Sequence, residues 1–487
     1  MKKLLGVLSI AVLLTQCSGP PDAPHHRLTW STPVDSLLQD TVNLSLLADS
    51  MRSLVGQAGS DTAALDPMAE LAQHLRGLIA LQLADEVIGQ SMDIGYAYGV
   101  ADGTCRRGIY YLRSGSQPLA DSLFRRSLAL AEHVPGRRGE MLKAQARMWM
   151  GEVKRQRGDM VGAIEQYDSS YTIAERVDDR KRMATCLGVK GAAFIMAGQL
   201  DSASHFLERS LTISRAIHDQ EREAFCLYCI GDIARFENRI PEAISAYHEA
   251  MDLCEVLNDR SRMSYGYGSL ADLYRLGSDL PNALLMYDKM RLVGLEKDDK
   301  STVASANFSI AEVYEDLDQP DKALEYYNLA LTHATEIELA QVMGPSYLGI
   351  GKMQAQQGHT ELALQAFQAG LDIASATKNT WIEVTCQNGI GDLYGELGDL
   401  EQAEEHFQKA VVLARATDDR SLPINLQRMG MSRLHRGDPR GAIAYGEEAL
   451  TAEQRMGARP KEMGIITNLL YRTYDTLQMP AKALAMY

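Results

Sequence analysis

The sequence predicts an all-α protein, an α-solenoid built from stacked helix-turn-helix units. The first observation is a period of 40 residues in alanine, which holds without exception at Ala163, Ala203, Ala243, Ala283, Ala323, Ala363 and Ala403. The series continues to Ala80 and Ala120 on one side and to Ala442 and Ala483 on the other, with slips of three residues or fewer. A fixed period of this size indicates repeated supersecondary units that bury their apolar faces on one another.

The second observation is the set of residue types that accompany each alanine. A large side chain such as Tyr247 or Phe367 follows it by four residues, and a mostly small side chain follows it by seven. These positions share one helix face, so they predict a helix whose packing surface alternates small and large groups. A glycine or a second alanine stands twelve residues before each periodic alanine, and such a small residue predicts that a preceding helix crosses the second helix closely. This repeat position, the glycine column, contains Gly108, Gly151, Gly191, Gly231, Ala271, Ala311, Gly351, Gly391 and Gly430.

The third observation is a helix-breaking residue between the two predicted helices. Glycine or a substitute stands five residues before the alanine, at Gly115, Gly158, Gly198, Asn238, Ser278, Gly358, Gly398 and Gly437. Glycine and asparagine tolerate the left-handed conformation that ends a helix, so each unit is predicted as a helix, a tight turn and a second helix. Ala, Leu, Glu, Met and Arg fill the remaining positions, and proline is largely confined to helix ends, as this assignment requires.

With these columns the chain resembles tetratricopeptide repeat proteins, most clearly over residues 311–334 and 391–414. The resemblance covers about residues 61–487 and implies a right-handed superhelix of about ten repeats, the last one incomplete. The period of 40 exceeds the family's usual length of about 34, which implies a longer second helix or a longer link between repeats. It is similar to an extended class whose links read Asp-x-Arg, found here at 178–180, 259–260 and 418–420. Armadillo-type and HEAT repeats have a period near this one but lack these columns.

The net charge and the absence of known catalytic motifs argue against several classes of function. The 487 residues carry a formal net charge of −15, which argues against nucleic acid and anionic membrane surfaces as the main partner. No phosphate-binding loop, dinucleotide fingerprint, zinc-protease motif or nucleophile elbow occurs. We therefore expect no enzyme activity, no cofactor and no metal site.

The N-terminus predicts export. Lys2 and Lys3 precede an apolar run of 11 residues that is too short to span a bilayer and is typical of a secretory signal. Residues 14–17, Leu-Thr-Gln-Cys, resemble a bacterial lipoprotein box, which implies cleavage after residue 16 and lipidation of Cys17. Gln16 departs from the usual small residue, so an ordinary cleavable signal or an uncleaved anchor stays open. Residues 17–60 are expected to form a tether and a divergent segment, and the array would face the periplasm or the cell surface.

Cysteine and tryptophan are interpreted as packing residues. Cys186, Cys226 and Cys386 share one repeat position, which the family resemblance places in the core, and they would substitute for alanine there. Cys226 and Cys229 form a Cys-x-x-Cys inside a predicted helix, where a redox or metal role remains a minor alternative. Trp149 and Trp381 are expected to be packing residues, as is Trp30.

The resemblance implies that the first helix of each repeat lines a concave groove that binds a protein or peptide. The residues at groove-facing positions are Tyr228, Asp232, Arg235, Tyr265, Asp272, Arg275, Phe308, Glu312, Glu315, Lys352, Asn388 and Asp392. Aromatic groups would bury apolar side chains of a peptide, while the polar groups would satisfy its backbone. The Asp-x-x-Arg pairs at 232/235 and 272/275 are the best local candidates, although each could equally be an ion pair within one helix.

Two further hypotheses concern the end of the chain. The last repeat stops midway through its second helix at Tyr487, so we expect either an incomplete product or a terminus that dimerises or frays.

The function predicted is a non-catalytic scaffold of the bacterial cell envelope. The alternative is the extracytoplasmic sensory region of a histidine kinase or helix-turn-helix regulator whose output domain lies beyond residue 487.

Overall fold

The computed structural model describes residues 65, 66, 68, 69, 78–417 and 419–486. The described part consists of helices joined by short turns, which agrees with the all-α prediction. The chain divides into two compact units, one up to Gly266 and the other from Tyr267. The predicted leader, the tether at 17–60, Cys17 and Trp30 lie outside the described residues.

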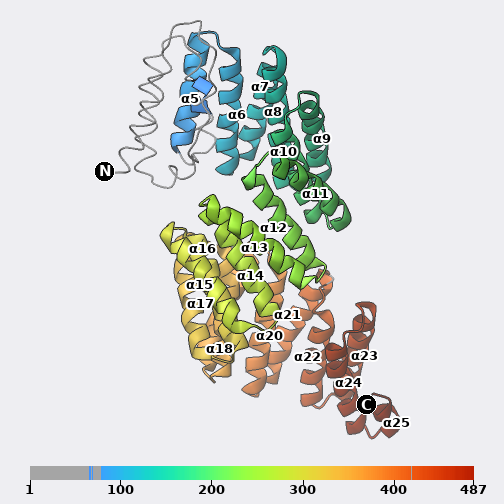
Figure 1. Ribbon diagram of the computed structural model, residues 1–487. Coiled ribbons are helices and arrows are strands. Elements are labelled where there is room, and N and C mark those ends of the chain that lie inside the picture. The colour runs from blue at the N-terminus through green and yellow to red at the C-terminus, as the bar shows by residue number, and fades with distance from the viewer. Residues whose placement is uncertain (1–64, 67, 70–77, 418, 487) are drawn as a thin grey trace. The chain divides into compact units, whose positions relative to one another are not determined.

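Helices of the first unit follow one another as antiparallel hairpins (Figure 1). They are α5 (Leu78–Asp93), α6 (Ala97–Arg113), α7 (Gln117–Ala131), α8 (Gly136–Gln156), α9 (Met160–Arg176), α10 (Arg180–Met196), α11 (Leu200–Ala216), α12 (Gln220–Phe236) and α13 (Ile240–Val256). The boundary between the units falls inside α14 (Arg260–Leu276).

The second unit repeats this arrangement. Its further helices are α15 (Leu280–Glu296), α16 (Lys300–Asp316), α17 (Pro320–Glu336), α18 (Ala340–Gln356), α19 (Thr360–Thr377), α20 (Thr380–Glu396), α21 (Leu400–Ala416), α22 (Leu422–His435), α23 (Pro439–Arg455), α24 (Pro460–Thr476) and α25 (Pro480–Met486). In both units a second helix, which carries the periodic alanine, packs on the first helix of its own repeat and on the first helix of the next.

Equal helix lengths explain the period of 40. Helices α10 to α13 each have 17 residues, and three-residue turns such as 197–199 and 217–219 separate them. Two helices and two such turns fill one period. Of the two expected sources of the additional length, the longer link is excluded by these three-residue turns, and the residues lie in the helices.

Both turns of a repeat use the left-handed conformation. The predicted breaker residues adopt it, with φ of +71° at Gly198, +58° at Asn238 and +59° at Ser278. The turn between repeats uses it as well, at non-glycine residues such as Asp178 and His218. The aspartates of the links cap the helix that follows. The side chains of Asp179, Asp219 and Asp259 each accept a hydrogen bond from the backbone N–H three residues later.

The glycine column lies at the helix crossings, as predicted. A Cβ atom placed on Gly231 would lie 2.6 Å from Cε1 of Tyr247, and one on Gly391 would lie 2.6 Å from Cε1 of Phe407. Gly191 and Gly351 meet the side chains of Leu207 and Phe367 in the same way. At these four crossings the large residue that follows the alanine therefore packs against a first-helix backbone that has no side chain at that point.

Small residues of the second helix add a polar link inside three hairpins of the first unit. The hydroxyls of Ser127, Ser170 and Ser210 donate to the carbonyl oxygens of Ala101, Ala144 and Ala184 at 2.8, 2.6 and 2.7 Å. Each serine is fully buried. These bonds satisfy a hydroxyl that would otherwise be costly in the core, so serine can replace alanine in this column.

The cysteine interpretation is confirmed, and the tryptophan interpretation is half right. Cys105, Cys186, Cys226, Cys229, Cys254 and Cys386 are all buried and free. Burial raises the pKa of the Cys226 and Cys229 thiols, so these groups are poorly reactive. Trp149 stacks on Phe124 with ring centroids 6.1 Å apart. Trp381 is 56% exposed, because it is the second residue of α20 and points away from the core.

The described residues contain neither a helix able to cross a bilayer nor a cluster of potential metal ligands. None of the described helices combines the length and apolar character needed to cross a bilayer. In the same part of the chain, His, Cys, Asp and Glu side chains form no group of three or more that could hold a metal ion.

Candidate ligand-binding surface of the first helices

The predicted groove residues all lie on first helices, and each unit holds its own set. Tyr228, Asp232 and Arg235 belong to α12, and Tyr265 belongs to the part of α14 in the first unit. The other eight are in the second unit, on α14, α16, α18 and α20. Their side chains differ widely in how much they are already engaged within the protein.

Asp232 is a junction between three helices. Its carboxylate accepts hydrogen bonds from the Tyr247 hydroxyl at 2.7 Å and from the Tyr265 hydroxyl at 2.8 Å. Arg235 approaches the same carboxylate at 3.9 Å, one helical turn away. The first Asp-x-x-Arg pair is therefore a long ion pair within α12, and Asp232 holds α13 and the start of α14 against it.

The two tyrosines at this junction have different exposure. Tyr228 is only 5% exposed, and its hydroxyl donates to the backbone oxygen of Arg262 at 2.8 Å. Burial, with the Cys254 thiol and the Asp259 carboxylate nearby, raises its pKa well above the usual value. Tyr265 is 48% exposed and meets the Tyr228 ring edge-on at 5.3 Å. Of the two, only Tyr265 offers a ligand a substantial surface.

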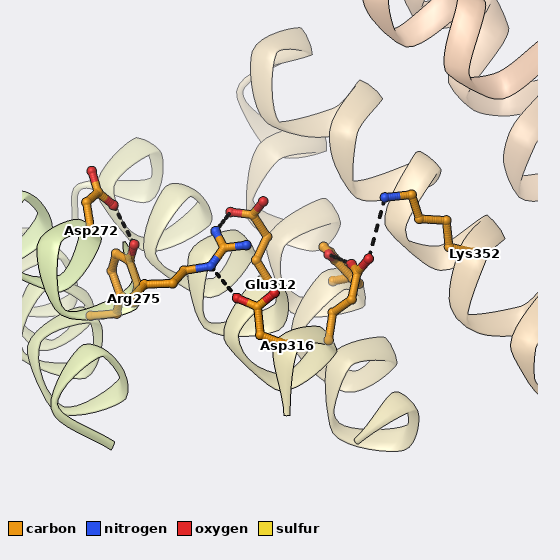
Figure 2. A network of polar contacts seen from close by, with 8 residues as sticks. Asp272, Arg275, Glu312, Asp316 and Lys352 are labelled. Carbon is orange, nitrogen blue, oxygen red and sulfur yellow. Dashed lines mark hydrogen bonds and ion pairs between the residues drawn. The ribbon is translucent and has the colours of Figure 1, made fainter. Parts of the chain in front are cut away.

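The second Asp-x-x-Arg pair is not an ion pair. Arg275 bonds instead to α16, with Nη1 at 2.8 Å from Glu312 and Nε at 2.6 Å from Asp316, as Figure 2 shows. Asp272 accepts a hydrogen bond from the hydroxyl of Tyr287. Arg275 therefore ties one repeat to the next, and both of its partners come from the following first helix.

Next to this network, the charge balance is negative. Glu315 accepts from the hydroxyl of Tyr327 at 2.7 Å and pairs with Lys352 at 3.4 Å (Figure 2). Burial raises the pKa of Glu312, and the negative charges of Glu315 and Asp316 add to that effect, which outweighs the attraction of Arg275.

The remaining candidates also have internal partners. Phe308 is partly buried and lies 5.8 Å from the Tyr327 ring. Asn388 is 9% exposed and donates to Oδ1 of Asn425 at 2.7 Å, while its own Oδ1 has no partner. Asp392 forms an ion pair with Arg428, and burial raises the pKa of that carboxyl.

Sequence reasoning missed an apolar row on the same helices. Met196, Phe236 and Leu276 stand seven residues before the periodic alanine in three successive repeats and are 58%, 57% and 68% exposed. Arginines accompany two of them. Arg155 Nη1 lies 3.2 Å from the sulfur of Met196, and the Arg235 guanidinium lies 4.7 Å from the centre of the Phe236 ring. The signal was the 40-residue recurrence of large apolar residues at a helix end.

This architecture defines a class of proteins built from stacked helical hairpins, in which the first helices present a mixed apolar and polar face. The sequence profile of the tetratricopeptide repeat matches residues 142–216, 302–376 and 383–455. The chain is therefore a tetratricopeptide repeat protein. No curated protein matches the sequence significantly.

Solved structures of similar fold include other repeat proteins. A Rap protein crystallised with competence and sporulation factor is 14% identical, with a TM-score of 0.47 over 73% of this chain and 98% of that one. A tetratricopeptide repeat protein from Parabacteroides merdae is 19% identical, with a TM-score of 0.41 over 60% and 98%. A signal transduction ATPase from Pyrococcus horikoshii is 14% identical, with a TM-score of 0.44 over 86% of this chain and 55% of that one.

Proposed function

We propose that this protein is a non-catalytic scaffold that binds a protein or peptide along the exposed faces of its first helices. The observation that carries the proposal is the apolar row of the first unit, Met196 and Phe236. These large side chains occupy one repeat position on α10 and α12, and each is more than half exposed. A repeated exposed apolar group of this kind is typical of an interaction surface, because leaving it in water costs free energy that a partner recovers.

Polar groups beside this row suit a peptide. Arg235 is one residue from Phe236, so a ligand lying on Phe236 has a guanidinium beside it, and the half-exposed Tyr265 ring offers further surface on the next first helix. Arginine and tyrosine beside an apolar anchor are the residue types that dominate binding energy at protein interfaces. Asp232, Tyr228 and Arg275 serve mainly to fix the helices that carry this surface.

The proposed location is the bacterial cell envelope, with the protein held by a lipid on Cys17. The support is the leader sequence, with its two lysines, its short apolar run and the cysteine that follows. Six further cysteines are buried in helices, which leaves Cys17 as the residue suited to lipidation.

The proposal is tested with a random-peptide library panned on the full-length protein, followed by calorimetric titration of an enriched peptide. Replacing Met196→Ser and Phe236→Ser together removes both apolar anchors. Burying one such side chain is worth about 1.5–3 kcal/mol, so we expect the double variant to bind at least about tenfold more weakly.

The control is Val161→Ser, which removes an apolar residue that is 73% exposed from the second helix α9. Its affinity should match that of the unchanged protein. The proposal is wrong if no peptide is enriched, or if the double variant binds as tightly as the control.

A further inference from the structure

The second helix α15 has an apolar outer face that the other described second helices lack. Leu285, Leu292 and Leu295 are 50%, 47% and 49% exposed on this helix. They stand two, nine and twelve residues after its periodic alanine, Ala283. Spacings of seven and three residues bring side chains to one side of a helix, so the three leucines form a continuous strip, the α15 leucine strip.

The same three repeat positions are polar on the helices α9, α11, α13, α17 and α19. On α17, for example, they are Glu325, Thr332 and Thr335. The stacking of hairpins therefore does not require an apolar residue at any of them. Because three neighbouring leucines in water cost free energy that a contact would recover, the strip indicates an interaction surface.

The charges beside the strip are balanced, although the chain as a whole carries a net charge of −15. Lys289 and Glu296 are seven residues apart on one side of α15, and neither forms an ion pair among the described residues. The Lys289 ammonium lies 5.5 Å from the centre of the Tyr267 ring. Asp288, which also borders the strip, is already paired with Arg291 at 2.5 Å. The strip thus offers one cation and one anion that have no counter-charge.

This pattern is complementary to itself when the helix is reversed. A second α15 can lie antiparallel to the first, with a twofold axis passing close to Leu292. The Leu292 side chains of the two copies then meet, Leu295 packs beside them, and Leu285 lies at the edge of the contact. Lys289 of each copy faces Glu296 of the other, because the two residues lie three and four positions from Leu292. Such a contact, in which one patch meets itself, is the kind that forms symmetric dimers.

We propose that two copies of this chain associate through the α15 leucine strip as an antiparallel homodimer. Opposite charges beside an apolar seam fix the orientation of paired helices, which is the role of Lys289 and Glu296 here. One pair of helices buries less area than a permanent dimer does, so the dissociation constant is expected to be on the order of micromolar. The inference concerns a second helix and is independent of the proposed peptide surface on the first helices.

The test is sedimentation velocity of the full-length protein from about 1 to about 100 µM, a range that spans a micromolar dissociation constant. The mean sedimentation coefficient should rise from the value of a monomer toward that of a dimer. The triple variant Leu285→Glu, Leu292→Thr, Leu295→Thr gives α15 the three residues of α17. It should keep the helix content and thermal midpoint of the unchanged protein. Its association should be at least about tenfold weaker, because the apolar seam is removed.

The control is Leu362→Glu, which removes a leucine that is 51% exposed on α19, outside the strip. Glutamate is accepted at this repeat position, since Glu242 occupies it on α13. This variant should dimerise as the unchanged protein does.

A charge exchange tests the orientation of the two helices. Lys289→Glu places two glutamates opposite each other and should weaken the dimer about fivefold. Adding Glu296→Lys to the same chain restores opposite charges in both pairs and should recover the original affinity. If the second change weakens the dimer further, the antiparallel pairing is wrong.

The proposal is overturned if the unchanged protein remains monomeric at the highest concentration, which would assign the strip to a different partner. It is also overturned if the triple variant dimerises as tightly as the unchanged protein, or if Leu362→Glu loses as much affinity as the triple variant. Peptide binding at Met196 and Phe236 is measured separately, so these outcomes do not decide the proposed function.

Discussion

At the scale of single residues, one absent side chain decides how closely two helices pack. Gly231 lets the Tyr247 ring lie flat on α12, and a Cβ atom there would come within 2.6 Å of the ring. The same contact recurs at Gly151, where a Cβ atom would lie 2.5 Å from the Tyr167 ring. The glycine column therefore reflects a steric requirement of the hairpin, and the aromatic residue of the second helix is its counterpart.

We expect Gly231→Leu to destabilise the protein by about 1–3 kcal/mol, because the added side chain overpacks the crossing of α12 and α13. Chemical denaturation followed by circular dichroism measures the change. Gly395→Leu is the matched control, since Gly395 is also inside a first helix but has no atom within 4 Å of an added Cβ. An unchanged denaturation midpoint for Gly231→Leu would contradict the packing assignment.

At the scale of elements, both turns of a repeat are built in one way. A 17-residue helix ends with one residue in the left-handed conformation, and an aspartate or asparagine often caps the next helix two residues or fewer later. Glycine provides the left-handed residue in some repeats and a side-chain-bearing residue does so in others. Since a Cβ atom raises the energy of that conformation, the second kind of turn stores avoidable strain.

Exchanging residues between two equivalent turns tests this explanation. Ser278 has a φ of +59° and Gly198 a φ of +71° at the same repeat position. We expect Ser278→Gly to stabilise the protein by about 0.5–1 kcal/mol and Gly198→Ser to destabilise it by a similar amount. Thermal melts of the two variants should shift in opposite directions. Shifts of the same sign would show that the turn conformation does not limit stability.

At the scale of the whole molecule, stability arises from neighbouring hairpins, within two compact units. Each described unit has its own hydrophobic clusters and its own polar ties, Asp232 with Tyr265 in the first and Arg275 with α16 in the second. Both units present first helices with exposed groups, so each offers surface for a partner. The N-terminal leader adds the proposal that this surface is displayed on a membrane.

Lipidation of Cys17 is tested in a bacterial host that expresses the full-length protein. Cys17→Ser should abolish incorporation of labelled palmitate, because the thiol that accepts the lipid is removed. Cys226→Ser, in which a buried thiol is changed instead, should leave labelling intact. Continued labelling of Cys17→Ser would eliminate Cys17 as the anchor.

The sequence by itself determined the repeat, its two helices and the turn between them. Each of these depends on contacts between residues close in sequence. The same glycine or alanine, alanine and mostly aromatic positions recur in about ten repeats, so the pattern is visible in the sequence. Only the tertiary structure decided which polar groups are free. Arg235 and Arg275 both belong to an Asp-x-x-Arg motif. Arg235 approaches a carboxylate of its own helix, whereas Arg275 bonds to a carboxylate of the next first helix, α16. Arg222 lacks the partner that Arg262 has in an equivalent position. Such pairings depend on whether a side chain can extend to a partner on another helix, and differences of about an ångström decide whether the contact forms. The spacing of residues in the sequence therefore does not predict them.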